Sequence, residues 1–159
     1  VLNYILESIG LKGLPWIYSQ DTAMMSVVLV ALWKEIGYYM VMFLAGLQNI
    51  PSTYYEAAEI DGASPVYTFF RITVPLISPT TFFVFIISVI GSFQIFDLTT
   101  VLTAGGPANS TYTTIMYVYK AGFNFFRMGY ASAISTVLFI IILVLTIIQN
   151  KFSKKWVNY

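Results

Sequence analysis

The chain has 159 residues, of which 58% are hydrophobic and only 9% are charged. Soluble domains carry about a quarter of charged residues, so this composition predicts an integral membrane protein. The net charge of +1 and the scattered Lys and Arg residues exclude nucleic acid as a partner, because phosphate binding needs a concentrated cationic face. Cysteine and histidine are both absent, which excludes disulfides, thiol nucleophiles, soft-metal sites and the usual general base. We therefore expect neither a metal site nor catalysis on this chain.

Residues 1–21 combine apolar residues with Gly10, Gly13 and Pro15, which interrupt regular structure. We expect an interfacial or loop segment here, or alternatively a frayed remnant of a preceding span. The chain starts at Val1 without a methionine or a positively charged leader, so we also expect a fragment of a longer subunit.

Residues 23–47 form the first predicted span, which is long enough to cross the bilayer core of roughly 30 Å as a helix. Lys34 and Glu35 fall near its centre, where a charge costs on the order of 2.5 kcal/mol or more unless it faces protein, water or a partner. Neighbouring residues on a helix diverge by about 100°, so the two side chains do not pair well with each other. Two hypotheses stay open: a residue that lines a pocket, or a structural ion pair between helices.

Residues 51–75 form an amphipathic loop between two apolar runs. Pro51 suits a first helical turn, Ser52 and Thr53 can cap it, and Glu56 places a negative charge near the positive end of the helix. A second short helix is predicted over residues 66–72, with Pro75 as its end. The break between the two helices is predicted at Gly62, followed by a capping Ser64 and a first-turn Pro65.

The second predicted span covers residues 80–102, and its second half is polar. Ser88 and Ser92 are four residues apart and share one helix face, whereas Gln94 and Asp97 share an adjoining one. Because polar groups facing lipid are costly, these side chains are candidates for a solute site. The alternative is that the serines bond to their own helix and Gln94 bridges to a neighbouring one.

Residues 103–130 form a predicted external loop, which opens with a tight turn at residues 104–107. A helix is expected from Thr111 to Phe123, amphipathic enough to lie at the membrane interface. The third predicted span covers residues 131–149 and carries no charge. The basic cluster directly after it marks the cytoplasmic side, which places loop 51–75 inside the cell and loop 103–130 outside. This cluster consists of Lys151, Lys154 and Lys155.

Loop 51–75 also carries the motif that places the chain among known proteins. Its Glu56-Ala57-Ala58, Gly62 and Ile72-x-x-Pro75 resemble the EAA loop of binding-protein-dependent ABC importer permeases, within the carbohydrate-uptake branch. The subunit type is similar to the first permease of maltose and glycerol-3-phosphate systems. The resemblance implies the C-terminal portion of a type I ABC importer transmembrane domain: three transmembrane helices, a cytoplasmic coupling-helix pair and an external interfacial helix.

The same resemblance implies a permease in a bacterial or archaeal plasma (inner) membrane, with a cytoplasmic C-terminus. Its expected partners are membrane lipid, a second permease subunit in a heterodimer, two ATP-binding cassette subunits, an extracytoplasmic solute-binding protein and a sugar. No phosphate-binding loop is present, so ATP and Mg²⁺ are expected on the partner ATPase and no cofactor or enzymatic activity on this chain. Alternatives are an importer of another small polar solute, or a channel or structural subunit.

Two sets of site residues follow from the resemblance and the helix geometry. The ATPase-coupling set is Glu56, Ala57, Ala58, Asp61, Gly62 and Pro75. The substrate-binding set is Trp33, Glu35, Tyr38, Ser88, Ser92, Gln94 and Asp97. A rise of about 1.5 Å per residue places most of the second set near the middle of the membrane, with Gln94 and Asp97 somewhat closer to the outer face, and we expect its two halves to meet. The charged Lys34-Glu35 pair departs from the more neutral residues of the family.

Overall fold

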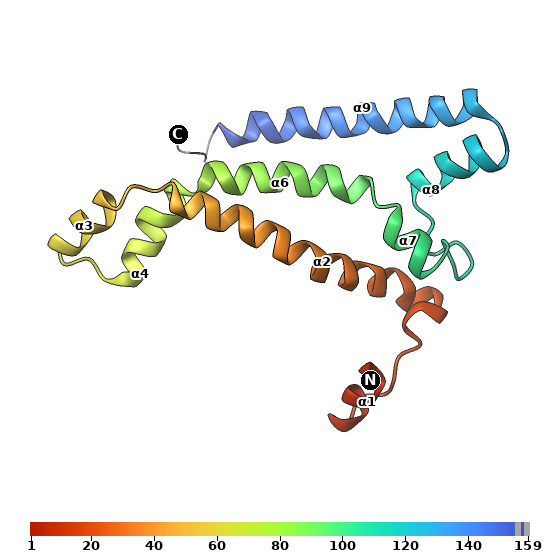
Figure 1. Cartoon of the computed structure of the whole chain (residues 1–159), viewed down its shortest axis with the longest axis horizontal. Coiled ribbons are helices and arrows are strands. Elements are labelled where there is room, and N and C mark those ends of the chain that lie inside the picture. Colours follow the sequence, from red (N-terminus) through yellow and green to blue (C-terminus); the bar gives the residue numbers. More distant parts are fainter. Residues whose placement is uncertain (155–156, 158–159) are drawn as a thin grey trace. The chain divides into compact units, whose positions relative to one another are not determined.

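The structure, a computed structural model, describes residues 1–154 and 157, and all regular elements among these residues are helical (Figure 1). The chain divides into two compact units. Unit 1 comprises Val1–Lys34 and Gln94–Thr136, and unit 2 comprises Glu35–Phe93 and Val137–Tyr159. The predicted all-α class is confirmed, and Lys155 of the predicted basic cluster lies outside the described residues.

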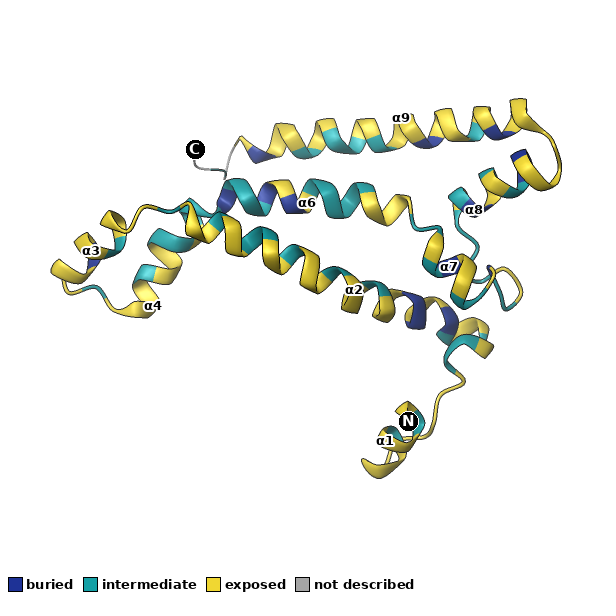
Figure 2. Cartoon of the chain, in the orientation of Figure 1, coloured by how far each residue is buried: buried dark blue, intermediate teal, exposed yellow. Residues whose placement is uncertain are grey.

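Two helices are long and apolar enough to cross a membrane, α2 (Gln20–Gln48) and α9 (Met128–Ser153). With 29 and 26 residues, both exceed the roughly 20 residues that the hydrocarbon core requires. They extend beyond the predicted ranges 23–47 and 131–149, because the polar residues that flank each apolar run are still helical. Most of the α9 surface is exposed on this chain, as Figure 2 shows, which suits a helix that meets lipid or another chain.

A third crossing is a bent pair of helical segments. Residues Pro65–Leu76 and helix α6 (Ser78–Phe93) pass the same test together, with a bend of 60° between them. Up to three membrane-spanning elements are therefore present in the described chain. Unit 2 buries Phe82 and Val84 of α6, and Leu138 of α9.

Helix α3 (Thr53–Ile60) ends as the sequence predicts, at a left-handed glycine. Gly62 has φ 72°, its amide donates to Glu59 O at 3.0 Å, and the amide of Ala63 donates to Ala58 O at 2.9 Å. This pair of hydrogen bonds is a Schellman motif, which satisfies the last carbonyls of the helix. The expected capping role of Ser52 is not seen, since its side chain makes no cap hydrogen bond and its backbone is already helical.

Helix α4 (Pro65–Thr68) begins at the predicted cap, where Ser64 Oγ accepts from the amide of Tyr67 at 3.3 Å. The helical path then continues through a π-helical turn (η2, Phe69–Thr73) into α5 (Val74–Leu76). The prediction that Pro75 ends this helix is therefore wrong. Proline is tolerated in the first turn of a segment, and the wider π turn ahead of it accommodates the missing amide hydrogen.

The actual break lies at Ile77, between α5 and α6. Pro79 cannot donate to the carbonyl of Pro75, which a regular helix would require. Ser78 Oγ donates to Pro75 O instead, at 2.6 Å, so the kinked junction keeps its carbonyl hydrogen-bonded.

The second predicted span is also interrupted. Helix α6 ends at Phe93, and a short helix α7 (Asp97–Leu102) follows after three non-helical residues, Gln94, Ile95 and Phe96. The prediction of one span over 80–102 is thus corrected. Asp97 favours a helix start, because a negative charge in the first turn interacts well with the free amides there.

A buried threonine, Thr111, stabilises the turn at the start of segment 103–127. Gly105 takes φ 86° in the predicted turn, Thr111 Oγ1 donates to Gly106 O at 2.9 Å, and Thr111 is completely buried. The helix expected from Thr111 to Phe123 is shorter: α8 (Thr114–Tyr119) starts after a cap by Thr113 and passes into a π turn (η3, Lys120–Asn124).

Near the N-terminus, α1 (Leu2–Ser8) and the 3-10 turn η1 (Trp16–Tyr18) are joined through Asn3, whose Oδ1 accepts from Trp16 Nε1 at 2.6 Å.

Candidate functional site

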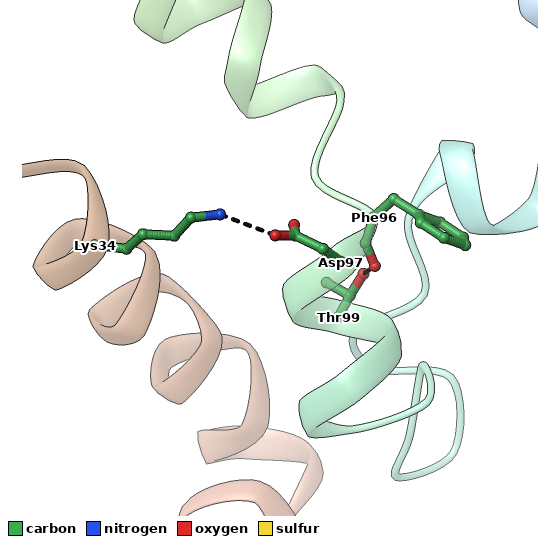
Figure 3. Close-up of polar contacts among 4 residues, drawn as sticks. All are labelled: Lys34, Phe96, Asp97 and Thr99. Atoms are coloured by element: carbon green, nitrogen blue, oxygen red, sulfur yellow. Dashed lines mark hydrogen bonds and ion pairs between the residues drawn. The ribbon is translucent and has the colours of Figure 1, made fainter. Parts of the chain in front are cut away.

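An ion pair joins α2 to α7 within unit 1 (Figure 3). Lys34 Nζ donates to Asp97 Oδ2 at 2.8 Å, and the side chains are 52% and 65% exposed. The two residues are 63 positions apart in the sequence, so the contact fixes α7 beside α2 in this unit. The pair is neutral as a whole, which lowers the cost of holding both charges at membrane depth.

The helix break before α7 brings Asp97 to this position. Two threonine hydroxyls donate to backbone carbonyls at this break. Thr99 Oγ1 donates to Phe96 O at 3.1 Å, as Figure 3 shows, and Thr113 Oγ1 donates to Ile95 O at 3.0 Å. An unsatisfied carbonyl in a membrane would cost several kcal/mol, on the order expected for any buried polar group in lipid. The break is therefore a stabilised structural element of unit 1.

Lys34 thus takes part in an ion pair between helices, one of the two hypotheses that the sequence leaves open. Its exposure shows that the pair does not lie in the interior of this chain. A half-exposed ion pair is unfavourable against hydrocarbon, so this face of α2 and α7 requires water or another polar surface beside it.

Glu35, the next residue along α2, has a different partner. Tyr39, one helical turn further on, places its hydroxyl near the Glu35 carboxylate within unit 2. Adjacent charges on α2 therefore point to separate partners, as expected from the 100° step between neighbouring residues. Tyr38 is 54% exposed, and its ring centroid lies 5.5 Å from that of Tyr39.

The two predicted serines bond to their own helix. Ser88 Oγ donates to Phe85 O at 2.9 Å, and Ser92 Oγ donates to Val89 O at 2.7 Å. This geometry matches the structural alternative for these residues. Each hydroxyl oxygen still has acceptor capacity, so a donor group of a solute remains compatible with both.

Trp33 and Gln94 belong to unit 1 and are exposed on it. Trp33 is 81% exposed and forms part of the wall of an apolar cavity of about 460 Å³, together with side chains from α1, η1, α2 and α7. Gln94 is the first residue of the helix break. Of the predicted substrate-binding set, unit 1 therefore holds Trp33, Gln94 and Asp97, and unit 2 holds the other four; that the two groups meet around one solute stays a prediction.

The predicted coupling residues surround a hollow between α3 and α4. Its volume is about 800 Å³, and four of the six predicted residues line it, namely Ala57, Ala58, Asp61 and Gly62. Glu56 is exposed in the first turn of α3, and Pro75 lies in α5. The hydroxyls of Tyr55 and Thr73 are 3.2 Å apart and tie α3 to η2.

Sequence reasoning did not assign Tyr54 and Tyr67 to the coupling set, although both line this hollow. Their position on either side of a predicted helix break is the signal that could have identified them. No group of three carboxylate, histidine or cysteine side chains suited to a metal occurs in the part of the chain that the structure describes.

Comparison with known proteins gives consistent matches along the chain. A family model described as "Binding-protein-dependent transport system inner membrane component" matches residues 2–158. The probable ABC transporter permease protein YurN of Bacillus subtilis is 40% identical over 97% of this chain and 53% of its own length. The sn-glycerol-3-phosphate transport system permease protein UgpA of Pectobacterium atrosepticum is also 40% identical, over 99% of this chain and 55% of its own.

A third relative, the arabinooligosaccharides transport system permease protein AraP of Bacillus subtilis, is 41% identical over 95% of this chain and 49% of its own. Among solved structures, a bacterial ABC transporter involved in the import of the acidic polysaccharide alginate has a chain that matches with a TM-score of 0.82 and 25% identity. That match covers 97% of this chain and 54% of the other. The chain thus spans about half the length of the relatives it matches.

Proposed function

Because the chain belongs to the family of binding-protein-dependent transport system inner membrane components, we propose that it is part of a permease subunit of an ATP-driven importer for a sugar or oligosaccharide. The observation that carries this proposal is the family match over residues 2–158, which includes the α3–α4 loop and the membrane-spanning helices α2 and α9. The relatives' solutes, a glycerol phosphate and arabinooligosaccharides, together with the alginate importer, favour a hydroxyl-rich solute.

The α3–α4 loop is the proposed docking surface for an ATPase subunit. It is a compact pair of helices fixed by the Schellman motif at Gly62 and by the Ser64 cap, and it has an open hollow between its helices. ATP and Mg²⁺ belong to that partner, and the present chain contributes no catalytic group. A rigid loop suits this role, because it transmits the movement of a partner without deforming.

The proposed solute contacts are Trp33, Gln94 and Asp97 of unit 1, with Lys34 beside Asp97, and Glu35, Tyr38, Ser88 and Ser92 of unit 2. Aromatic faces suit the C–H surface of a sugar ring, and hydroxyl, amide and carboxylate groups suit its hydroxyls. Half-exposed charges at membrane depth support a polar path beside the Lys34–Asp97 pair.

The complete importer would contain a second permease subunit, two ATPase subunits and an extracytoplasmic binding protein that delivers the solute. The alginate importer has been solved in complex with a periplasmic protein that binds an alginate pentasaccharide, which supports such a partner here. Closure of the ATPase pair would move the α3–α4 loops together and alternate the access of the site between the two sides. The C-terminal lysines support a cytoplasmic C-terminus.

The experiment is solute-stimulated ATP hydrolysis by the complete transporter, after the solute has been identified by thermal-shift screening of its binding protein against sugars. Glu56→Lys reverses an exposed charge on α3 and should abolish stimulation, whereas the control Glu7→Lys makes the same change on α1 and should not. Full stimulation in the Glu56→Lys transporter would remove the coupling role of the loop. Passive solute flux in the absence of ATP would instead favour the channel alternative.

A further inference from the structure

Three tyrosines form a row with a cation at each end: one precedes α8, one lies in α8 and one lies in the first turn of α9. The rings of Tyr112 and Tyr117 lie 6.2 Å apart, as do those of Tyr117 and Tyr130, and both contacts are edge-on. Lys120 Nζ lies 4.5 Å from the centre of the Tyr112 ring, and Arg127 Cζ lies 5.2 Å from the centre of the Tyr130 ring. We call Tyr112, Tyr117 and Tyr130 the tyrosine row. The three tyrosines and the two cations all belong to unit 1.

The row lies at the end of a membrane-spanning helix. Tyr130 is in the first turn of α9, so it belongs to the level at which this helix enters the membrane. Phe125 and Phe126 precede the helix, with Arg127 between them and its first residue, and they are 63% and 81% exposed. Phe126 has φ 55°, a left-handed conformation that is strained for a non-glycine residue, and the amide of Arg127 donates to Ala121 O at 2.8 Å across this turn. Exposed phenylalanines next to tyrosines and cations at the end of an apolar helix are typical of a membrane–water boundary.

The part of the chain after Asp97 has basic side chains but no acidic ones. No Asp or Glu follows Asp97 in the sequence, so the chain from residue 98 onward supplies cations but no carboxylate side chain. The contacts recorded for Lys120 and Arg127 are with tyrosine rings, which leave the donor edges of the cations available for an anion. The two cations also lie at the end of α9 opposite Lys151; with the cytoplasmic C-terminus proposed above, this end is extracytoplasmic, where cations flanking membrane helices are less frequent. Their presence there calls for an anionic partner.

We propose that Lys120, Arg127 and the tyrosine row bind the headgroup of an anionic phospholipid at the N-terminal end of α9. The Arg127 guanidinium suits two oxygens of a phosphodiester, and Lys120 supplies a second, compact charge. The tyrosine hydroxyls can donate to phosphate or glycerol oxygens, while Phe125 and Phe126 contact the upper acyl chains. A lipid fits better than a soluble acidic oligosaccharide, because only a lipid covers the charged row and the two exposed phenylalanines together.

The test is native mass spectrometry of the intact transporter, titrated with phosphatidylglycerol or with phosphatidylcholine. One cation near an anionic membrane surface is worth about a fivefold change in binding, so removing two should weaken the tightest phosphatidylglycerol site about 25-fold. The variant is Lys120→Gln/Arg127→Gln. The matched control, Lys12→Gln/Arg71→Gln, removes one lysine and one arginine elsewhere and should keep this site. Phosphatidylcholine should bind both variants and the wild type alike.

Tyr117→Leu provides a second variant that keeps both charges and a large apolar side chain but removes the central ring and hydroxyl of the row. It should also weaken phosphatidylglycerol binding, which separates a built site from diffuse attraction to the membrane. Equal phosphatidylglycerol affinity in the wild type and the Lys120→Gln/Arg127→Gln variant would overturn the proposal, as would equal affinity in Tyr117→Leu. Two competitors complete the test: if inorganic phosphate or alginate oligosaccharides displace phosphatidylglycerol from this site at comparable concentrations, the site binds free anions or an acidic solute and the lipid assignment is wrong.

Discussion

Gly46 on α2 is the position where an added methyl group should be most costly in unit 2. A Cβ atom built there would lie 2.8 Å from Thr80 Cγ2 and 2.9 Å from Thr80 Cβ, and closer still to Thr80 Oγ1. Distances under 3.0 Å require a shift of the neighbour. Thr80 has little freedom to shift, because a β-branched side chain on a helix is restricted at χ1. We therefore expect Gly46→Ala to push α2 away from α6.

The magnitude follows from two opposing effects. Overpacking a tight contact costs typically about 1–3 kcal/mol. Replacing glycine by alanine inside a helix gains about 0.8–1 kcal/mol. Gly37 lies on the same helix and has no atom within 4 Å of an added Cβ, so Gly37→Ala carries the gain without the clash. The difference in unfolding free energy between the two variants should therefore be about 1–3 kcal/mol.

The assay is unfolding of the purified transporter in detergent, monitored by heat or denaturant for the two single variants. Thr80→Ala should recover most of the loss when it is combined with Gly46→Ala, because it removes the atoms that clash. If Gly46→Ala and Gly37→Ala unfold at the same denaturant concentration, the close approach of α2 to α6 at Gly46 does not exist in the protein and the reasoning is refuted.

Three further predictions concern the ion pair, the topology and the solute path. Lys34→Gln should lower the melting temperature more than the double variant Lys34→Gln/Asp97→Asn, because the single change leaves one charge without its recorded partner; an equal loss in both would show that the pair adds nothing. A cysteine at the exposed Asn109 should react with an impermeant maleimide outside cells, and one at Glu59 only after the membrane is opened; the reverse pattern would invert the orientation. Gln94→Leu should weaken uptake several-fold with assembly intact, since a hydrogen bond is worth about 0.5–1.5 kcal/mol; unchanged uptake would move the solute path elsewhere.

Local chemistry made part of the fold predictable. The helix stop at Gly62 and the start at Ser64-Pro65 depend only on conformational preferences of adjacent residues, and the structure shows both. The two interruptions beside α6 were not predicted. Pro75 is compatible both with ending a helix and with the first turn of another, and the choice depends on Ser78, which accommodates the proline that follows it.

In the candidate site, too, the sequence predicted which residues need partners but not every partner. Charge at membrane depth identified Lys34 and Glu35 as residues in need of partners, and helix geometry showed that they do not satisfy each other. The Tyr39 hydroxyl that lies near Glu35 is one turn away on α2. The partner of Lys34 is 63 residues away, and sequence spacing alone could not identify it, because the break at Gln94–Phe96 sets the direction of Asp97.

The bend at Ile77 has a mechanical consequence. The segments Pro65–Leu76 and α6 meet at 60°, and the Ser78–Pro75 hydrogen bond bridges their joint, so a rotation of the first segment would swing α6. With 16 residues, α6 is about 24 Å long, and a tilt of roughly 5° at the joint would displace its far end by about 2 Å. A more flexible joint, as in Ser78→Gly, would let α4 and α5 rotate without moving α6. A movement applied to α4 and α5 would then no longer be transmitted to α6.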